Sequence, residues 1–247
     1  MATAVDGHTV HQVFSEEYTE ICKDKICRED LDLSGIGFSD KIAYVLHNVL
    51  TLAECENLIQ KTESVGYSPA LVHAGNVAVF APGYRDSQRL MIDDTEFASI
   101  LFKRIGPHLP QQFQDNPEDN TTIFKLKEIN ERLRFLRYDI GDKFKAHYDS
   151  YYERPDVSAV TWVTLQAYLN DESLVGGETT FLGEAGSEDE WSQEEFRVPV
   201  APTTGSILVF QHDILHEGSK VLGGRKYTIR MDVLYAPDED ADKGLDD

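Results

Sequence analysis

The chain has 247 residues, of which 41% are hydrophobic and 27% are charged, a balance typical of one folded globular domain. Asp and Glu total 44 against 23 Lys and Arg, which gives a formal net charge of −21. Such an acidic chain repels phosphate backbones and anionic lipid headgroups, so we expect neither a nucleic-acid partner nor a membrane partner.

Cysteine usage and the first residues indicate a reducing compartment. Cys22, Cys27 and Cys55 are odd in number and form no Cys-x-x-Cys pair, so neither a disulfide framework nor a structural zinc site is indicated. The chain begins without the basic and apolar regions of a secretory signal, and no run reaches the roughly 18 apolar residues of a membrane span. The expected location is the cytoplasm or the nucleus.

Both ends of the chain should lie outside the main domain. Residues 1–38 are a polar segment, partly helical or flexible, in which Glu16 to Arg28 is a candidate helix. Residues 237–247 are an acidic tail, and such a run of like charges is typically solvated. Between these ends we expect a single domain over residues 39–236.

The first part of that domain, residues 39–125, should give helical support to a sheet. The short apolar run Ile-Ala-Tyr-Val-Leu at 42–46 predicts a strand. Thr51-Leu-Ala-Glu54 has the form of a capping box and predicts the start of an amphipathic helix. A second helix is predicted over Thr95–Ile105, where apolar residues recur at helical spacing before a Gly-Pro pair.

Residues 126–236 change character to short runs rich in β-branched and aromatic residues, separated by Gly, Pro and Asp. This pattern indicates a β-sandwich or open barrel, so the fold class is mainly β with flanking helices. The acidic stretch Gly183 to Glu195 is interpreted as a long hairpin insertion. The candidate strands are Arg132–Tyr138, Phe144–Asp149, Val160–Leu169, Glu178–Leu182, Ser206–Phe210 and Lys226–Tyr235.

One group of residues has the composition of a metal site. His147 and Asp149 are one residue apart, so on a strand both side chains project from one face, with Cα atoms about 7 Å apart. His216 should come from a neighbouring strand; His212, four residues before it, is the rival for this position. Two imidazoles and one carboxylate suit a non-haem Fe(II) centre and leave coordination positions open for a chelating co-substrate and dioxygen.

The surrounding motifs resemble the 2-oxoglutarate- and Fe(II)-dependent dioxygenases of the prolyl 4-hydroxylase type. The resemblance extends over about residues 40 to 236 and is strongest from residue 131 onward. The motifs that carry it are Leu133-Arg-Phe-Leu-Arg-Tyr138 with Gly141, Phe144, His147 and Asp149, then Gly176-Gly177-Glu178-Thr179 and Phe181, then Thr204-Gly205 to Phe210, and finally His216 and Lys226.

This resemblance implies a double-stranded β-helix, or jelly-roll, with His147, Asp149 and His216 as the iron ligands at its mouth. It implies that Lys226 pairs with the distal carboxylate of 2-oxoglutarate and that the hydroxyl groups of Tyr138 and Thr179 bind the same co-substrate. A dianion in an apolar barrel needs a fixed cation, because an unpaired buried charge is costly. Arg225 would replace Lys226 if the strand register slipped by one residue.

The resemblance also implies the reaction. Dioxygen would be consumed, 2-oxoglutarate would be decarboxylated to succinate, and an unactivated C–H bond would be hydroxylated, with ascorbate as an implied accessory reductant. The carboxylate of Asp149 favours hydroxylation, since halogenating relatives carry a small residue in its place.

Three residues are candidates for substrate contact. Arg230 lies four residues beyond Lys226 and therefore on the same strand face, where it meets a substrate carboxylate or forms a structural pair with Glu178 or Asp232; we favour the structural pair. Arg85 and Tyr151 lie in predicted loops, and an ordinary loop role is the alternative for each.

The leading hypothesis is a hydroxylase of prolyl residues in a peptide or protein. The second is a hydroxylase of a free amino acid or small metabolite, and the third is a non-catalytic jelly-roll that serves as an acidic interaction module. The sequence predicts no oligomeric state.

Overall fold

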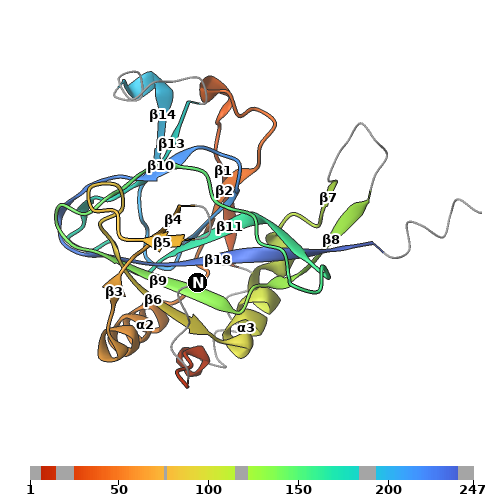
Figure 1. Ribbon diagram of the computed structural model, residues 1–247, viewed down its shortest axis with the longest axis horizontal. Helices are drawn as coiled ribbons and strands as arrows, with labels where there is room; N and C mark the ends of the chain where they lie inside the picture. The colour runs from red at the N-terminus through yellow and green to blue at the C-terminus, as the bar shows by residue number, and fades with distance from the viewer. Residues whose placement is uncertain (1–6, 15–24, 75–76, 115–121, 184–192, 239–247) are drawn as a thin grey trace, which may run out of the picture.

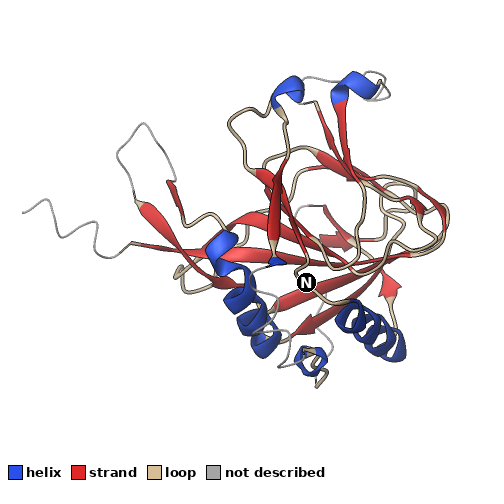
Figure 2. Cartoon of the chain, turned by 180° about the vertical axis from the view of Figure 1, so that it is seen from behind, coloured by secondary structure: helices blue, strands red, loops and turns tan. Residues whose placement is uncertain are grey.

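The protein is described by a computed structural model that covers residues 7–14, 25–74, 77–114, 122–183, 193–238. It is mainly β, and two α-helices, α2 (Leu52–Val65) and α3 (Thr95–Ile105), lie among the described residues. The helices cover one face of a large sheet, and a small sheet faces its other side (Figures 1 and 2). Neither described helix combines the length and apolar character that a membrane crossing needs.

The large sheet is antiparallel, and its strands come from both halves of the chain. The long strand β18 (Lys226–Pro237) lies at its centre and also pairs with β8 (Ile123–Ile129), which in turn pairs with β7 (Gln112–Gln114). The other strands, in spatial order, are β1 (Cys27–Asp30), β2 (Ala43–His47), β15 (Ile207–Gln211), β11 (Val160–Tyr168), then β18, and then β9 (Arg132–Tyr138), β6 (Gln88–Asp93) and β3 (Ser68–Pro69).

From residue 132 onward the chain alternates between the large sheet and the small one. The small sheet has the order β10 (Phe144–His147), β16 (His216–Gly218), β13 (Thr179–Leu182) and β14 (Arg197–Val200). This alternation is that of the expected double-stranded β-helix. Two short antiparallel pairs complete the strands: β12 (Val175–Gly176) with β17 (Val221–Gly223), and β4 (Val72–Ala74) with β5 (Val77–Val79).

Successive side chains of a strand point to opposite faces of the sheet, so one strand can contribute to two apolar cores. On β15, Ile207 and Val209 join the apolar core between the large sheet and the helices. Leu208 and Phe210, on the other face, join the core between the two sheets. A continuous apolar run therefore marks a strand that is buried on both faces.

The two predicted helices are confirmed. Each begins with a capping interaction between residues that are close in sequence. The Thr51 hydroxyl accepts from the backbone N–H of Glu54 at 3.1 Å, and the Glu54 carboxylate accepts from the backbone N–H of Thr51 at 2.9 Å. Asp94 caps α3 by accepting from the N–H of Phe97 at 3.0 Å.

Glu54 also forms a buried ion pair that joins α2 to α3. Its carboxylate accepts two hydrogen bonds from Arg104, at 2.7 and 3.0 Å, and both side chains are almost fully buried. We predict that Glu54→Gln lowers the free energy of unfolding by about 3–5 kcal/mol, because it removes the carboxylate that neutralises the buried guanidinium of Arg104. Urea denaturation would measure this change.

The matched control for that measurement is Asp93→Asn, which breaks the half-exposed Asp93–Arg132 pair. This pair is solvated, so its loss should cost less than about 1 kcal/mol. Equal effects of the two substitutions would contradict the role assigned to the buried pair.

Several predictions of elements need correction. The candidate helix over Glu16 to Arg28 cannot reach its predicted end, because Cys27–Asp30 pairs with β2 as a strand; residues 15–24 lie outside the described residues. Residues 39–125 contain strands as well as the two helices, since β2, β3, β6 and β7 within them belong to the large sheet. β13 and β14 pair antiparallel, as a hairpin insertion requires, but residues 184–192 of that insertion are not described.

Candidate active site

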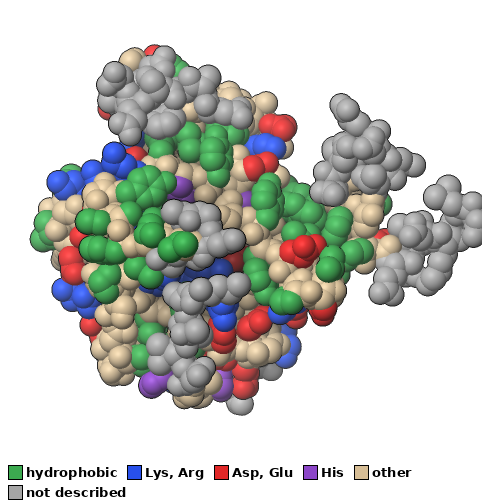
Figure 3. Space-filling model, viewed as in Figure 1, with side chains coloured by type: hydrophobic (Ala, Val, Ile, Leu, Met, Phe, Trp, Pro, Cys, Tyr) green, Lys and Arg blue, Asp and Glu red, His purple; other side chains and the backbone are tan. Residues whose placement is uncertain are grey.

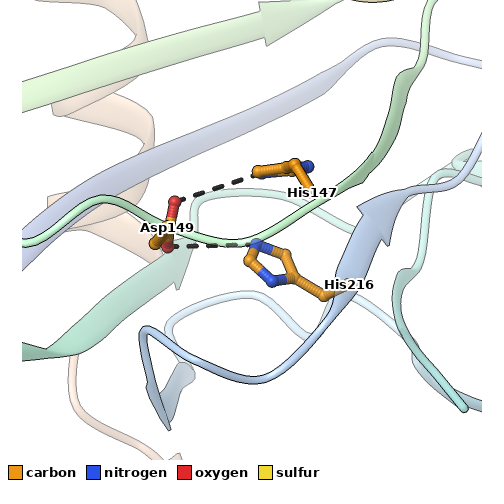
Figure 4. Close-up of side chains that lie close together, drawn as sticks. All are labelled: His147, Asp149 and His216. Carbon is orange, nitrogen blue, oxygen red and sulfur yellow. Dashed lines mark ion pairs between the residues drawn. The ribbon is translucent and has the colours of Figure 1, made fainter. Parts of the chain in front are cut away.

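Three potential metal ligands converge at one end of the small sheet (Figure 4). His147 ends β10 and His216 begins β16, and the two residues are direct cross-strand partners. Asp149 lies beyond the end of β10 rather than on it, which corrects the prediction; its backbone N–H donates to the His212 carbonyl at 3.0 Å. The ligand atoms of the three side chains lie within 4.8 Å of one another.

The hydrogen bonds of the two imidazoles leave the Nε2 atoms available to a metal. Nδ1 of His147 lies 2.8 Å from the Lys145 carbonyl, and Nδ1 of His216 lies 2.9 Å from the Ile214 carbonyl. A carbonyl oxygen only accepts, so each Nδ1 carries the proton and each Nε2 carries the lone pair. Burial and the neighbouring His216 lower the pKa of His147 to about 3, so this ring is neutral at pH 7.

A set of polar groups holds the Asp149 carboxylate in its ionised form. Burial by itself would raise the pKa of Asp149, but the Arg230 guanidinium and the neighbouring imidazoles lower it below its ordinary value. Arg230 lies 3.1 Å from the carboxylate, and the Thr164 hydroxyl donates to it at 2.6 Å. Asp149 is therefore a carboxylate of fixed orientation, as a metal ligand requires.

His212 lies outside the group of candidate metal ligands. Its Nδ1 lies 2.9 Å from the hydroxyl of Thr164, and its Nε2 lies 3.0 Å from the hydroxyl of Thr161, so both ring nitrogens already have partners. The sequence placed His212 as a rival to His216. The structure instead places it behind Asp149, where it supports Thr164.

The three side chains open into a cavity of about 570 Å³ between the two sheets. Figure 3 shows histidine and basic side chains recessed in the middle of this face. Among the described residues, no fourth His, Cys, Asp or Glu joins the three ligands. A metal bound here would keep positions open toward the cavity.

Lys226 gives the cavity a buried cation. Its side chain is 2% exposed, and its Nζ lies 5.4 Å from the ring centre of Tyr138 and 5.5 Å from that of Tyr168. Within the part of the chain that the structure describes, no carboxylate lies within 4.0 Å of this ammonium group. A buried ammonium without an ion-pair partner is a site for an anion.

The strand register decides between the two neighbouring basic residues. Lys226 pairs with Tyr138 across β9 and β18 and points inward, whereas Arg225 is exposed and forms an ion pair with Asp139. Thr179, the other candidate hydroxyl group, lines the same cavity and accepts a hydrogen bond from Tyr168 at 2.8 Å.

The three candidates for substrate contact all line the cavity. Arg230 forms the structural pair with Asp232 at 3.1 Å, one of the two partners proposed, and also pairs with Asp149. The Arg85 guanidinium lies 4.4 Å from the ring centre of Phe144. Tyr151 is 54% exposed at the mouth.

Sequence reasoning missed the groups that support the site. Thr164 and His212 act on Asp149, and Phe144 stacks on His147 with ring centres 3.6 Å apart. Three further arginines, Arg89, Arg132 and Arg134, line the cavity. Period-two alternation was the available signal for Arg134, since it places this residue on the same face of β9 as Tyr138.

Comparisons with known proteins agree with this geometry. The family model described as 2OG-Fe(II) oxygenase superfamily matches residues 133–231, which span β9 to β18 and contain all three ligands. Over these residues the chain is similar to this superfamily. Its cofactors, Fe(II) and 2-oxoglutarate, fit the residues present: a group of two free Nε2 atoms and one carboxylate for the metal, and a buried ammonium for the acid.

Two curated plant relatives are distant. The chain is 26% identical over 204 residues to "Probable prolyl 4-hydroxylase 8" and 27% identical over 210 residues to "Prolyl 4-hydroxylase 2", both from Arabidopsis thaliana. Each match covers 75% of this chain and 66% or 64% of the relative, so the chain spans slightly less than two thirds of these relatives.

The fold is also similar to that of a solved structure. A prolyl-4-hydroxylase from Pseudomonas putida aligns with a TM-score of 0.50 and 17% identity, covering 82% of this chain and 94% of that one. At this identity the likeness concerns the fold alone.

Proposed function

We propose that the chain is a 2-oxoglutarate- and Fe(II)-dependent dioxygenase that hydroxylates an unactivated C–H bond in a prolyl residue of a peptide or protein. The observation that carries the oxygenase assignment is the open group of His147, Asp149 and His216 in one cavity with the buried cation Lys226. The names of the plant relatives support a prolyl substrate.

Each residue of the site has a defined task in this reaction. His147, Asp149 and His216 hold the metal, and Lys226 binds the distal carboxylate of the co-substrate, with hydrogen bonds from Tyr138 and Thr179. Bound Fe(II) and 2-oxoglutarate supply the oxidising chemistry: dioxygen is consumed, succinate and carbon dioxide form, and one oxygen atom enters the substrate. Arg230 and Thr164 keep Asp149 ionised and oriented.

Ascorbate is the proposed accessory reductant that keeps the iron ferrous. The carboxylate at position 149 supports hydroxylation, because a ligated carboxylate leaves no room for a bound halide. The intact ligand group and the buried Lys226 argue against a non-catalytic interaction module.

A second candidate function is hydroxylation of a free amino acid or another small acid. The observation that favours it is the number of arginine side chains that face the cavity. The two candidate functions share the metal, the co-substrate and the reaction, and they differ in the substrate that enters the cavity.

Turnover measurements test the proposal. Succinate formation from 2-oxoglutarate should depend on Fe(II) and be stimulated by proline-containing peptides, with one oxygen atom added to the peptide in the mass spectrum. Stimulation by free amino acids alone would transfer the assignment to the second candidate. Absence of succinate formation with every peptide and amino acid would contradict the proposal.

The pH dependence of co-substrate binding is a further prediction. Burial lowers the pKa of Lys226 to about 8, with Glu178 acting in the opposite direction. Only the protonated amine attracts a carboxylate, so 2-oxoglutarate affinity should be constant below pH 8 and fall about tenfold per pH unit above it. Calorimetry with Mn(II) in place of oxidisable Fe(II) would measure this.

Lys226→Arg is the control for the pH experiment. A guanidinium stays protonated in proteins, so the affinity of this variant should be flat across the same range. An unchanged pH profile in the variant would show that another group causes the fall.

A further inference from the structure

The cavity concentrates positive charge in a strongly acidic chain. The formal net charge is −21, yet arginines from three neighbouring strands and one loop point into a single space. Since like charges repel at close range, such a cluster needs negative partners within the cavity. The five arginines are Arg85, Arg89, Arg132, Arg134 and Arg230.

Three of these arginines have carboxylate partners in the protein. The positive charge of each of these three guanidinium groups is balanced within the protein, so these groups are not available to bind a ligand. The pairs are Arg132 with Asp93 at 2.7 Å, Arg134 with Asp232 at 2.8 Å, and Arg230 with both Asp149 and Asp232 at 3.1 Å.

Arg85 and Arg89 differ from the other three. In the described ranges of the chain, no carboxylate lies within 4.0 Å of either guanidinium group. Among the described residues, the side chain of Arg85 makes a long hydrogen bond from Nε to the Ser87 hydroxyl, at 3.3 Å, and contacts the Phe144 ring. Burial and the nearby cations, with Arg85 first among them, lower the pKa of Arg89 to about 10.

Iron and the co-substrate do not remove this excess. The two positive charges of Fe(II) and the two negative charges of 2-oxoglutarate cancel. Lys226 lies on β18 opposite Tyr138 of β9, whereas Arg89 lies on β6 opposite Leu136 of β9, so strand β9 stands between the two cations. Arg85 and Arg89 are therefore left for a third component.

The position of Arg85 connects this cationic pair to the metal ligands. The Phe144 ring contacts both the Arg85 guanidinium, at 4.4 Å from the ring centre, and the His147 imidazole, at 3.6 Å between ring centres. A group bound at Arg85 thus lies one aromatic side chain away from an iron ligand. This is close enough for a short organic acid to reach both the arginines and the metal.

We infer that Arg85 and Arg89 form a carboxylate subsite for the substrate, so that the hydroxylated molecule carries a carboxylate within a few bonds of the reacting carbon. The inference rests on the proposed function. A planar guanidinium binds a carboxylate through two parallel hydrogen bonds, which fixes orientation as well as affinity. The carboxylate belongs to a free amino acid or to an acidic residue beside a prolyl residue.

Matched acid and amide probes test the subsite. N-acetyl-L-proline and N-acetyl-L-prolinamide differ in a terminal carboxylate, and the N-acetylated, amidated dipeptides Pro-Glu and Pro-Gln differ in a side-chain carboxylate. Calorimetry would measure their dissociation constants with the Fe(II) and 2-oxoglutarate complex under anaerobic conditions. In at least one pair the acid should bind at least about tenfold tighter than the amide.

Substitutions then assign that preference to named residues. Arg85→Gln and Arg89→Gln should each reduce the acid-to-amide ratio toward one, because each removes one charged donor. Arg132→Gln is the matched control, since this cavity arginine is already paired with Asp93 and should leave the ratio unchanged. A preference in the proline pair would indicate a terminal carboxylate, and a preference in the dipeptide pair would indicate the side chain of a neighbouring acidic residue.

The possible failures are distinguishable. The anaerobic complex of Fe(II) with 2-oxoglutarate should show a weak visible charge-transfer band, and loss of that band in the unsubstituted protein refutes the proposed function. A normal band with no acid preference in either probe pair overturns the carboxylate subsite alone. A preference that survives in both Arg85→Gln and Arg89→Gln also overturns it.

Discussion

The His147→Ala variant should bind Fe(II) more than about 100-fold more weakly and should lose 2-oxoglutarate turnover. Loss of a group that merely supports a ligand costs about 10–100-fold in metal affinity, so loss of a ligand should cost more. His147 supplies one of only three donors, and its Nδ1 is already committed to the Lys145 carbonyl. No nearby group in the described chain can replace its Nε2.

Anaerobic titration with Fe(II) in the presence of 2-oxoglutarate measures this effect, because the visible charge-transfer band reports the assembled chelate. His47→Ala is the matched control. His47 is a half-buried histidine on β2 that pairs with Glu29 at 2.8 Å and does not line the cavity, so its variant should keep the band. An unchanged band in His147→Ala would refute the metal centre.

The Lys226→Met variant should bind 2-oxoglutarate about 30-fold to 4,000-fold more weakly while retaining Fe(II). Methionine keeps the length and apolar stem of lysine but removes the charge. Truncating one partner of a buried charge pair costs about 2–5 kcal/mol, which corresponds to this range of affinities. The large value follows from burial, since Lys226 is 2% exposed and lies against two aromatic rings.

Equilibrium binding of 2-oxoglutarate, followed separately from metal binding, measures the Lys226→Met effect. The control is Lys41→Met, which breaks a solvated pair with Asp213 at 3.0 Å and should change the affinity less than twofold. If Lys226→Met binds 2-oxoglutarate as the unsubstituted protein does, the anchor lies elsewhere, and Arg85 and Arg89 become its candidates.

Local signals explain which predictions of elements succeeded. The capping box at Thr51 and Glu54 and the cap at Asp94 act within a few residues, so both helices could be predicted from the sequence. Strand β9 was predicted with its observed ends, because polar and apolar residues alternate over Arg132–Phe135 and the run continues with Leu136 and Tyr138. Strands β6 and β8 were missed, since pairing partners distant in sequence stabilise them.

The sequence by itself determined the chemical composition of the site: two histidines, one carboxylate and one lysine, in the order and spacing of a known superfamily. Only the tertiary structure decided how these groups are used. Cross-strand pairing places His147 opposite His216, and hydrogen bonds to Thr161 and Thr164 remove His212 from the choice of ligands.

The roles of the arginines likewise depended on the folded structure. Arg230 and Arg85 were both candidates in the sequence, but only contacts across strands show that Arg230 already has carboxylate partners. Arg89 had no sequence signal, because its importance comes from the absence of a carboxylate near it among the described residues. Sequence specifies which charges exist, whereas packing specifies which of them remain for a ligand, because ion pairing depends on distances between segments far apart in the chain.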